Sequence, residues 1–328
     1  MKYKELTLTI IGRYIKSVSY VRKLLFLGIC TFNGVQCYSQ SYDTLVMKDA
    51  THQIKMMGYP IQDKLLLYAK PKVYTFIQYL PHTYQGAAEI SFHKSSLKGW
   101  AAMAGSTTVL LLADQKLLDA VQQFSIHIGL DAEREYKDFV PFKFGKKDAS
   151  LYDVPDNLNS VIYSLGEGMP SLFLSAGLLT YGLIKKDYRS ISTASQIVQA
   201  TLAMGITTQI LKRMTGRESP FVATKSAGVW HPFTNLKTYQ QNVPSYDAFP
   251  SGHMGTLMST TIVIAANYPE KKWIRPVGYS IMSLVGLAML NNGTHWASDY
   301  PLAIGMGYVF GHATVKMNRL MKESWKRK

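Results

Sequence analysis

Two histidines and an aspartate in the last third of the chain have the residue types needed to cleave a phosphate ester. His253 ends the run Pro-Ser-Gly-His, and His295 and Asp299 follow about 40 residues later as His-x-x-x-Asp. A carboxylate on one imidazole nitrogen fixes the tautomer and leaves the other nitrogen free to attack phosphorus. His253 could then give a proton to the departing alkoxide. The two motifs together predict phosphoryl chemistry.

The residues around these groups are suited to holding the phosphate itself. Ser251 is a plausible N-cap at the start of a helix, and Gly252 lets the backbone approach a ligand closely. Because the first N–H groups of a helix are unpaired and carry partial positive charge, a helix N-terminus binds phosphate. Lys212, near the end of an earlier predicted helix, adds a cation for the phosphoryl oxygens. His295 and Asp299 share one face if the chain is helical there.

Apolar helices are the elements that must position these residues. After an earlier helix over 97–124, apolar periodicity predicts further helices over 169–184, 191–214, 251–267, 273–290 and 296–317. Thr215-Gly216 is a stop signal for the second of these five, and a long aromatic loop over 217–250 follows it. Strand patterns are weak throughout, so the predicted fold class is all-α, a helical bundle.

Three motifs together resemble the phosphatidic acid phosphatase type 2 / haloperoxidase superfamily. They are the segment from Lys212 to Pro220, the Pro-Ser-Gly-His run, and the segment from Gly293 to Asp299. The resemblance covers roughly residues 165–316, about half of the chain, and the spacing and helix context of the motifs agree with it. It implies a helical bundle that acts on phosphate esters with neither a metal nor a cofactor.

The resemblance also implies a role for each site residue. His295 is the nucleophile that forms a phosphohistidine, Asp299 orients it, and His253 is the general acid. The phosphate would be held by Lys212 and by the backbone amides of Ser251 and Gly252.

Two positions depart from the superfamily pattern, because Ser219 and Met289 stand where it has phosphate-binding arginines. A charge-assisted hydrogen bond contributes roughly 1.5–3 kcal/mol, so losing two without compensation costs on the order of 10² to 10⁴ in rate. Arg217, or Arg213 beside the same motif, could swing in as a substitute. We therefore expect Arg217 to contact the phosphate.

Charge and composition restrict the partners. The chain has 36 Lys and Arg against 21 Asp and Glu, a net charge of +15. Such a balance suits nucleic acid, an anionic membrane or a phosphorylated substrate, but no long basic run precedes the C-terminus, which argues against nucleic acid. We expect a phosphorylated lipid or another phosphate ester as substrate, and a membrane as partner.

The predicted organisation has four segments. They are a signal peptide or N-terminal anchor (1–40), an N-terminal region (41–164), the phosphatase-like helical domain (165–317) and a basic tail (318–328). The predicted helices have apolar cores of about 15 to 20 residues, at the lower edge for spanning a bilayer. Basic residues at 185–186, 271–272 and the tail fall on one side of the bundle, which the positive-inside rule makes cytoplasmic. The prediction is a cell-membrane protein whose site faces outward, into the periplasm; the alternative is a soluble periplasmic protein.

Three functions stay open at this point. The first is a phosphatase that hydrolyses a phosphoric monoester or diphosphate outside the cytoplasmic membrane. The second is a transferase that passes the phosphoryl or phospho-head-group to an acceptor other than water, and the missing arginines favour it somewhat. The third is a weakened pseudoenzyme that binds lipid.

Overall fold

The protein is mostly helical. A computed structural model describes residues 44–48, 53–61, 64–69, 75–138, 141–144, 147–150 and 153–324. The predicted signal peptide or anchor over 1–40 lies outside these residues, as do the last four residues of the basic tail. The prediction of an all-α fold is wrong for the N-terminal region, where seven short strands occur among the described residues. They are only three to nine residues long, and the longer ones, such as Lys64–Ala69 with its run of three leucines, do not alternate apolar and polar residues, so no clear period-2 pattern marks them.

Three of the strands form an antiparallel sheet against one end of the helices. The strands are β1 (Thr44–Lys48), β2 (Gln53–Ile61) and β3 (Lys64–Ala69), in the order β1-β2-β3. Tyr68 of β3 is buried and its hydroxyl donates to Oδ1 of Asn267 over 2.9 Å. The sheet therefore contacts the helical bundle through specific polar bonds.

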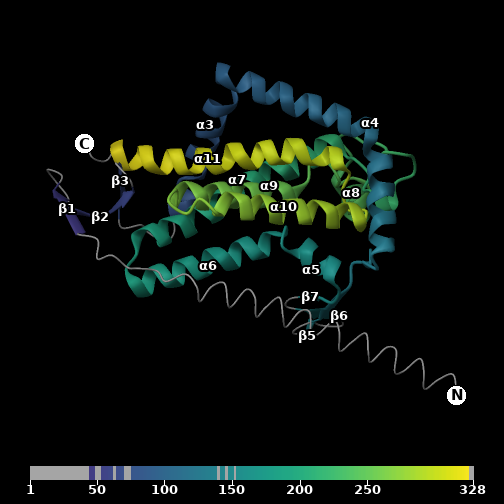
Figure 1. Cartoon of the computed structure of the whole chain (residues 1–328), viewed down its shortest axis with the longest axis horizontal. Helices are drawn as coiled ribbons and strands as arrows, with labels where there is room; N and C mark the ends of the chain where they lie inside the picture. The colour runs from purple at the N-terminus through teal and green to yellow at the C-terminus, as the bar shows by residue number, and fades with distance from the viewer. Residues whose placement is uncertain are drawn as a thin grey trace.

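Four further strands and two helices surround the other end. The strands are β4 (Tyr136–Asp138), β5 (Pro141–Phe144), β6 (Lys147–Ser150) and β7 (Asp153–Pro155), which pair as β4-β7 and β5-β6. Before them α4 (Leu97–His127) crosses the bundle, and α5 (Leu158–Ser164) follows them (Figure 1). A helix predicted over 97–124 is thus present, three residues longer at its C-terminal end.

The bundle itself consists of five long helices lying side by side (Figure 1). They are α6 (Gly168–Lys185), α7 (Tyr188–Thr215), α9 (Gly252–Asn267), α10 (Ile274–Asn291) and α11 (Tyr300–Ser324). Each matches a predicted helix within a few residues, except that α11 begins later and runs on through most of the predicted tail. Its first predicted residues form a short 3-10 helix, η4 (Ala297–Asp299), instead.

Short elements fill the remaining connections. Ahead of α4 lie α2 (Thr75–Gln78), α3 (Leu80–Ser91) and the 3-10 helix η1 (Lys94–Ser96). The loop predicted over 217–250 contains the 3-10 helices η2 (Pro220–Val222) and η3 (Val243–Ser245) and the helix α8 (Leu236–Gln241).

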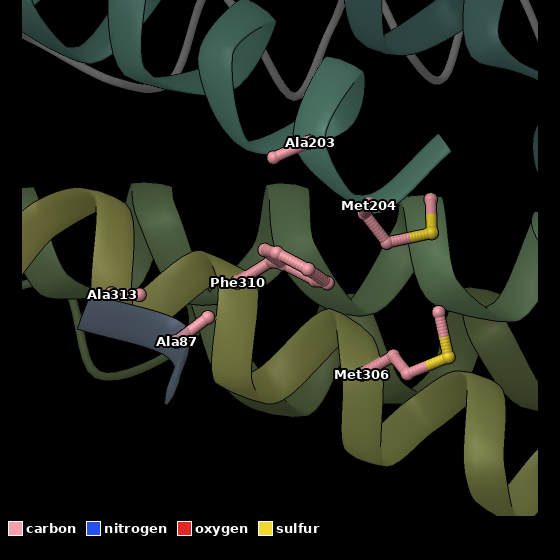
Figure 2. Close-up of a cluster of buried hydrophobic side chains, with 6 residues drawn as sticks. All are labelled: Ala87, Ala203, Met204, Met306, Phe310 and Ala313. Carbon is pink, nitrogen blue, oxygen red and sulfur yellow. The ribbon is translucent and has the colours of Figure 1, made fainter. Parts of the chain in front are cut away.

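One core cluster joins the N-terminal region to the bundle. Ala87 of α3 packs with Met204 of α7 and Phe310 of α11 (Figure 2). Gly86 beside it has no side chain because a Cβ there would come to 2.7 Å from Cγ of Met317. Helix α3 is therefore an integral layer of the bundle.

Several outer helix faces keep apolar side chains exposed. Examples are Phe173 and Ile184 of α6, Ile206 and Ile210 of α7, and Leu287 of α10. Nevertheless, within the described ranges none of the helices combines the length and the apolar character required to cross a bilayer. Membrane embedding therefore stays a prediction.

Candidate active site

The end of α7 delivers Lys212. The helix stops at Gly216, which adopts a left-handed backbone (φ 59°) and whose N–H donates to the carbonyl of Lys212 over 2.8 Å. A Cβ at this glycine would come to 1.9 Å from the carbonyl oxygen of His231, so only glycine fits. The buried ammonium of Lys212 lies 2.7 Å from Oδ2 of Asp247, and Oδ1 of the same carboxylate accepts a hydrogen bond from the hydroxyl of Tyr239. An incoming phosphate would therefore have to share this cation with Asp247.

The start of α9 delivers the Pro-Ser-Gly-His run. Ser251 is the N-cap, and its Oγ accepts from the N–H of Met254 over 3.5 Å. The amide of Ser251 donates to the carbonyl of Asp299 over 3.0 Å, so the structure does not leave this amide open to phosphate as predicted. Gly252 is the first helical residue and has no intrahelical acceptor. A Cβ on it would meet only a Thr208 methyl at 4.0 Å, so this side of the helix end is open.

His253 lies under aromatic and backbone cover. The ring of Tyr163 is 4.4 Å from its ring, centroid to centroid, and Gly166 packs so closely that a Cβ there would come to 2.9 Å from the His253 ring. Its Nε2 is buried and has no hydrogen-bond partner in the described part of the chain. Burial lowers the pKa of His253 well below its usual range, and the nearby His295, Lys212 and Arg134 add to this effect. His253 is therefore neutral at pH 7.

His295 is held by a main-chain acceptor. Its buried Nδ1 lies 2.7 Å from the carbonyl oxygen of Ala248, whereas Oδ2 of Asp299 is 3.5 Å away. Since a carbonyl only accepts, Nδ1 carries the proton and Nε2 bears the lone pair. The predicted orienter, Asp299, is adjacent, but the short hydrogen bond goes to Ala248. His295 precedes the 3-10 helix η4, so the chain is not α-helical over this pair and the condition for a shared helix face is not met.

The two imidazoles meet at the helix end. The ring centroids of His253 and His295 are 5.9 Å apart, with the rings nearly perpendicular. Within the described residues, no hydrogen bond engages Nε2 of either ring. Both rings can therefore contact a single phosphoryl group.

The prediction that Arg217 contacts the phosphate is wrong. The structure places it in a buried ion cluster, fully excluded from solvent, 2.6 Å from Oδ1 of Asp299 and 2.7 Å from Oδ2 of Asp114. Its guanidinium also donates to Oγ of Ser298 and to the carbonyl of Ala227. Two carboxylates and two neutral acceptors thus occupy four of its five N–H groups. The physical reason for the difference is that a buried guanidinium needs such partners, and α4 supplies one that its own motif lacks.

Asp114 is a site residue that the sequence analysis missed. It lies on α4, is fully buried, and accepts from the N–H and Oγ of Ser298 over 2.9 and 2.5 Å. It therefore braces the turn between His295 and Asp299. The sequence does contain an indication of this role, because Asp114 directly follows the apolar stretch of residues 100–113. A carboxylate at such a position is expected to be buried with a partner rather than exposed to water.

The helix ends of this bundle bring together the N-terminus of α9, a lysine and two histidines, as the motifs predicted. Residues 193–321, about two fifths of the chain, match the sequence model of the PAP2 superfamily. The resemblance inferred from the motifs is confirmed.

Similar individual proteins include a lipid A 1-phosphatase of Porphyromonas gingivalis, 29% identical over 66 residues. That match covers 20% of this chain and 15% of the relative. Two crystal structures are also similar. LpxE of Aquifex aeolicus is 17% identical, covering 48% of this chain and 83% of that one, with a TM-score of 0.36. A PAP2 type phosphatidylglycerolphosphate phosphatase of Bacillus subtilis is 16% identical, covering 77% and 98%, with a TM-score of 0.33.

Proposed function

We propose that this protein is a phosphatase that hydrolyses a phosphoric monoester or diphosphate through a phosphohistidine. One observation carries the proposal: in the described part of the chain, the buried Nε2 of His253 has no hydrogen-bond partner, and the ring of His295, whose Nε2 is likewise unbonded there, lies 5.9 Å away. An unpaired buried polar atom is costly unless a ligand completes it. The match of residues 193–321 to the PAP2 superfamily model supports this function, and so does the similarity to a lipid A 1-phosphatase of Porphyromonas gingivalis.

The first step forms the covalent intermediate. Nε2 of His295 attacks phosphorus, and the bond from phosphorus to the leaving-group oxygen breaks. His253 transfers its proton to that oxygen, so the leaving group departs as an alcohol, or as a phosphate if the substrate is a diphosphate. Because His253 is neutral in the empty site, it must take up its proton together with the anionic substrate, whose charge favours the imidazolium.

The second step returns the enzyme to its starting state. Neutral His253 removes a proton from a water molecule, whose oxygen attacks phosphorus and breaks the bond to Nε2 of His295. Inorganic phosphate leaves, and His253 gives the proton taken from water to solvent, which restores the neutral imidazole. During both steps the N–H of Gly252 and the ammonium of Lys212 stabilise the phosphoryl oxygens, with Lys212 exchanging Asp247 for the phosphate.

A lipid phosphate is the substrate class that we propose first, and a site outside the cytoplasmic membrane is its location. The exposed apolar side chains of α6, α7 and α10 favour contact with lipid, and the relative from Porphyromonas gingivalis is named for lipid A. An export reporter fused after residue 240 should be active. An inactive reporter there, active when fused to a known exported protein, would contradict the location.

Phosphate release by the purified protein tests the activity. The wild type is compared with His295→Ala on phosphatidic acid, an isoprenyl diphosphate and lipid A. We expect release from at least one of them, and loss of at least about 10³-fold in the variant. Equal release by both proteins would refute hydrolysis through His295.

The intermediate can be trapped directly. Brief incubation with a ³²P-labelled substrate, followed by quenching in alkali, should leave acid-labile label on the protein. His295→Ala should carry none. Label on the variant at the wild-type level would place the covalent chemistry elsewhere.

Transfer to another acceptor is the second candidate, favoured by the absence of guanidinium groups at Ser219 and Met289. Adding an alcohol acceptor to the same assay distinguishes the two. A hydrolase releases phosphate at an unchanged rate, whereas a transferase produces a new phosphate ester at the expense of phosphate. A wild type that binds lipid phosphate and produces neither would support the pseudoenzyme.

A further inference from the structure

The site lacks a guanidinium from any of the motif positions. Ser219 is buried, with its N–H bonded to the carbonyl of Pro244, and Met289 is fully buried in a core cluster. Arg217 is held by two carboxylates, and Arg213 donates to Gln209 on its own helix. A phosphoryl group at the two histidines would therefore meet none of these arginines.

A different arginine lies beside the histidine pair. The guanidinium carbon of Arg134 is 5.1 Å from the ring centroid of Phe221 and 5.9 Å from that of Tyr163. Tyr163 covers His253, and the N–H of Phe221 donates to the carbonyl of Gly293, two residues before His295. Arg134 thus lies between the two segments that carry the histidines.

The guanidinium of Arg134 is available. Its side chain is exposed, and within the described part of the chain no carboxylate lies in ion-pair range of it. The guanidinium lies over the Phe221 and Tyr163 rings, interacts with the Tyr163 hydroxyl and lies near enough to Glu167 to act on it through space. An incoming anion would bind the N–H groups that these neighbours leave.

The backbone that carries Arg134 is anchored on both sides. The carbonyl of Glu133 accepts from Nδ2 of Asn157 over 2.7 Å, and the N–H of Glu135 donates to Oγ of Ser160 over 3.0 Å. Asn157 and Ser160 belong to the N-terminal turn of α5, whose other end packs on His253 through Tyr163. The position of Arg134 is therefore fixed relative to the site before any substrate arrives.

We propose that Arg134 binds the phosphoryl oxygens of the substrate and replaces the arginines that the superfamily motifs lack here. A planar fork of N–H donors suits two oxygens of one phosphoryl group. The influence of Arg134 on the pKa of His253 agrees with this position. The proposal rests on the proposed function for its catalytic meaning, but phosphate binding can be measured without turnover.

The experiment compares the wild type with Arg134→Gln, Arg134→Lys and the control Lys137→Gln. Lys137 lies three residues away and pairs with Asp156 over 2.7 Å, with more than half of its side chain exposed. Binding of inorganic phosphate is followed by ³¹P line broadening, and the His253 pKa by NMR of labelled histidine. We expect Arg134→Gln to weaken phosphate binding about 10- to 100-fold and to raise the His253 pKa. Arg134→Lys should retain part of the affinity, and Lys137→Gln all of it.

Three results would overturn the proposal. They are wild-type phosphate affinity in Arg134→Gln, an equal loss in Lys137→Gln, and no phosphate binding by the wild type. The thermal midpoint of Arg134→Gln, expected to match that of the wild type, excludes a folding defect. Failure of the phosphatase proposal is a separate result, because it appears as unchanged turnover in His295→Ala, whatever Arg134 does to phosphate affinity.

Discussion

At the scale of single residues, the most consequential group is His253. Its ring is enclosed by Tyr163 and Gly166, and cations lie near it, so burial and the nearby positive charge keep the imidazole neutral. The imidazole can act as a general acid only after an anion binds beside it and favours its protonation. Because burial of His253 lowers its pKa in the folded state, it also makes the stability of the fold depend on pH.

This linkage gives a prediction with a definite sign. The pKa of His253 is lowered in the folded state, so between that value and about 6.5 the unfolded chain binds more protons than the folded one. The free energy of unfolding should therefore fall on acidification, by at most about 1.4 kcal/mol between pH 7.5 and 5.5 from this group alone. Urea unfolding of wild type and His253→Gln at these pH values measures it.

The variant removes this contribution, whereas the other titratable groups are present in both proteins. His253→Gln should lose less stability than the wild type over the same interval. Identical losses would show that His253 is not held neutral by the fold.

The motifs predicted which side chains gather at the site, but not what each one touches. His253, His295 and Asp299 come together as their spacing indicates. The partner of His295 Nδ1 is a carbonyl 47 residues away in sequence, and no residue type marks such an acceptor. Arg217 was misplaced because a sequence shows that an arginine is near a motif, but not that a distant helix supplies its carboxylates.

At the scale of elements, α4 has a larger role than its sequence indicates. It contacts η4, α10 and α11, and it brings Asp114 to the turn that carries Asp299. A helix from outside the matched superfamily segment thus supports the catalytic turn.

Removing that support should harm both stability and rate. Asp114→Ala leaves the buried guanidinium of Arg217 with one carboxylate instead of two, and it removes the acceptor of the Ser298 N–H. We therefore expect the free energy of unfolding to fall by about 3–5 kcal/mol. Among molecules that remain folded at low temperature, kcat should fall more than KM rises, because Asp114 positions the turn without touching substrate. Thermal unfolding and steady-state kinetics test both effects.

The matched control is Asp119→Ala, five residues along the same helix. Asp119 is exposed and accepts a hydrogen bond from Gln115. Its replacement should change stability by less than about 0.5 kcal/mol. Similar losses in the two variants would mean that the buried cluster is not what Asp114 contributes.

Restoring a superfamily arginine on α10 should fail in this chain. Met289 is 0% exposed and packs with Tyr163 and Val285, so Met289→Arg would bury a charge that has no carboxylate partner there. We expect a drop in the thermal midpoint and no gain in phosphatase activity. Leu287→Arg, on the same helix at a position 51% exposed, should leave both unchanged. Higher activity in Met289→Arg would show that the pocket still accommodates the original arginine.

Element prediction succeeded where apolar periodicity was long. The five bundle helices and α4 extend over 16 residues or more, and their residues repeat on a helical period that sequence alone reveals. Strands such as β4 and β7, with three residues each, form because each has the other as a partner. Their existence depends on tertiary pairing, so no local pattern could indicate them.

At the scale of the whole molecule, the N-terminal region and the superfamily domain share one interior. Helix α3 contributes to the core of α7 and α11, the β1–β3 sheet bonds to the end of α9, and α4 supplies Asp114 (Figure 1). The division at residue 164 proposed from the sequence stays a prediction, and its independence can be tested directly.

A chain that begins at residue 158 should not fold as a unit. It would expose the face of Phe310 and Met306 that α3 covers, and it would leave Arg217 without Asp114. We expect no cooperative thermal transition in near-ultraviolet circular dichroism and no binding of inorganic phosphate. A sharp transition at the full-length midpoint would instead establish an autonomous domain.

The carbonyl of Ala248 has a consequence for how this site tolerates mutation. Every residue type presents the same main-chain oxygen, so no point substitution at position 248 deletes the acceptor that sets the His295 tautomer. The position of this acceptor depends instead on the contacts that hold the backbone in place, such as the hydrogen bond from the Ala248 N–H to the Arg217 carbonyl. The side chain of Asp299 is therefore not the only group that orients the imidazole of His295. Lineages of this protein should therefore tolerate insertions or deletions between 217 and 248 poorly, because these would move the Ala248 carbonyl away from His295.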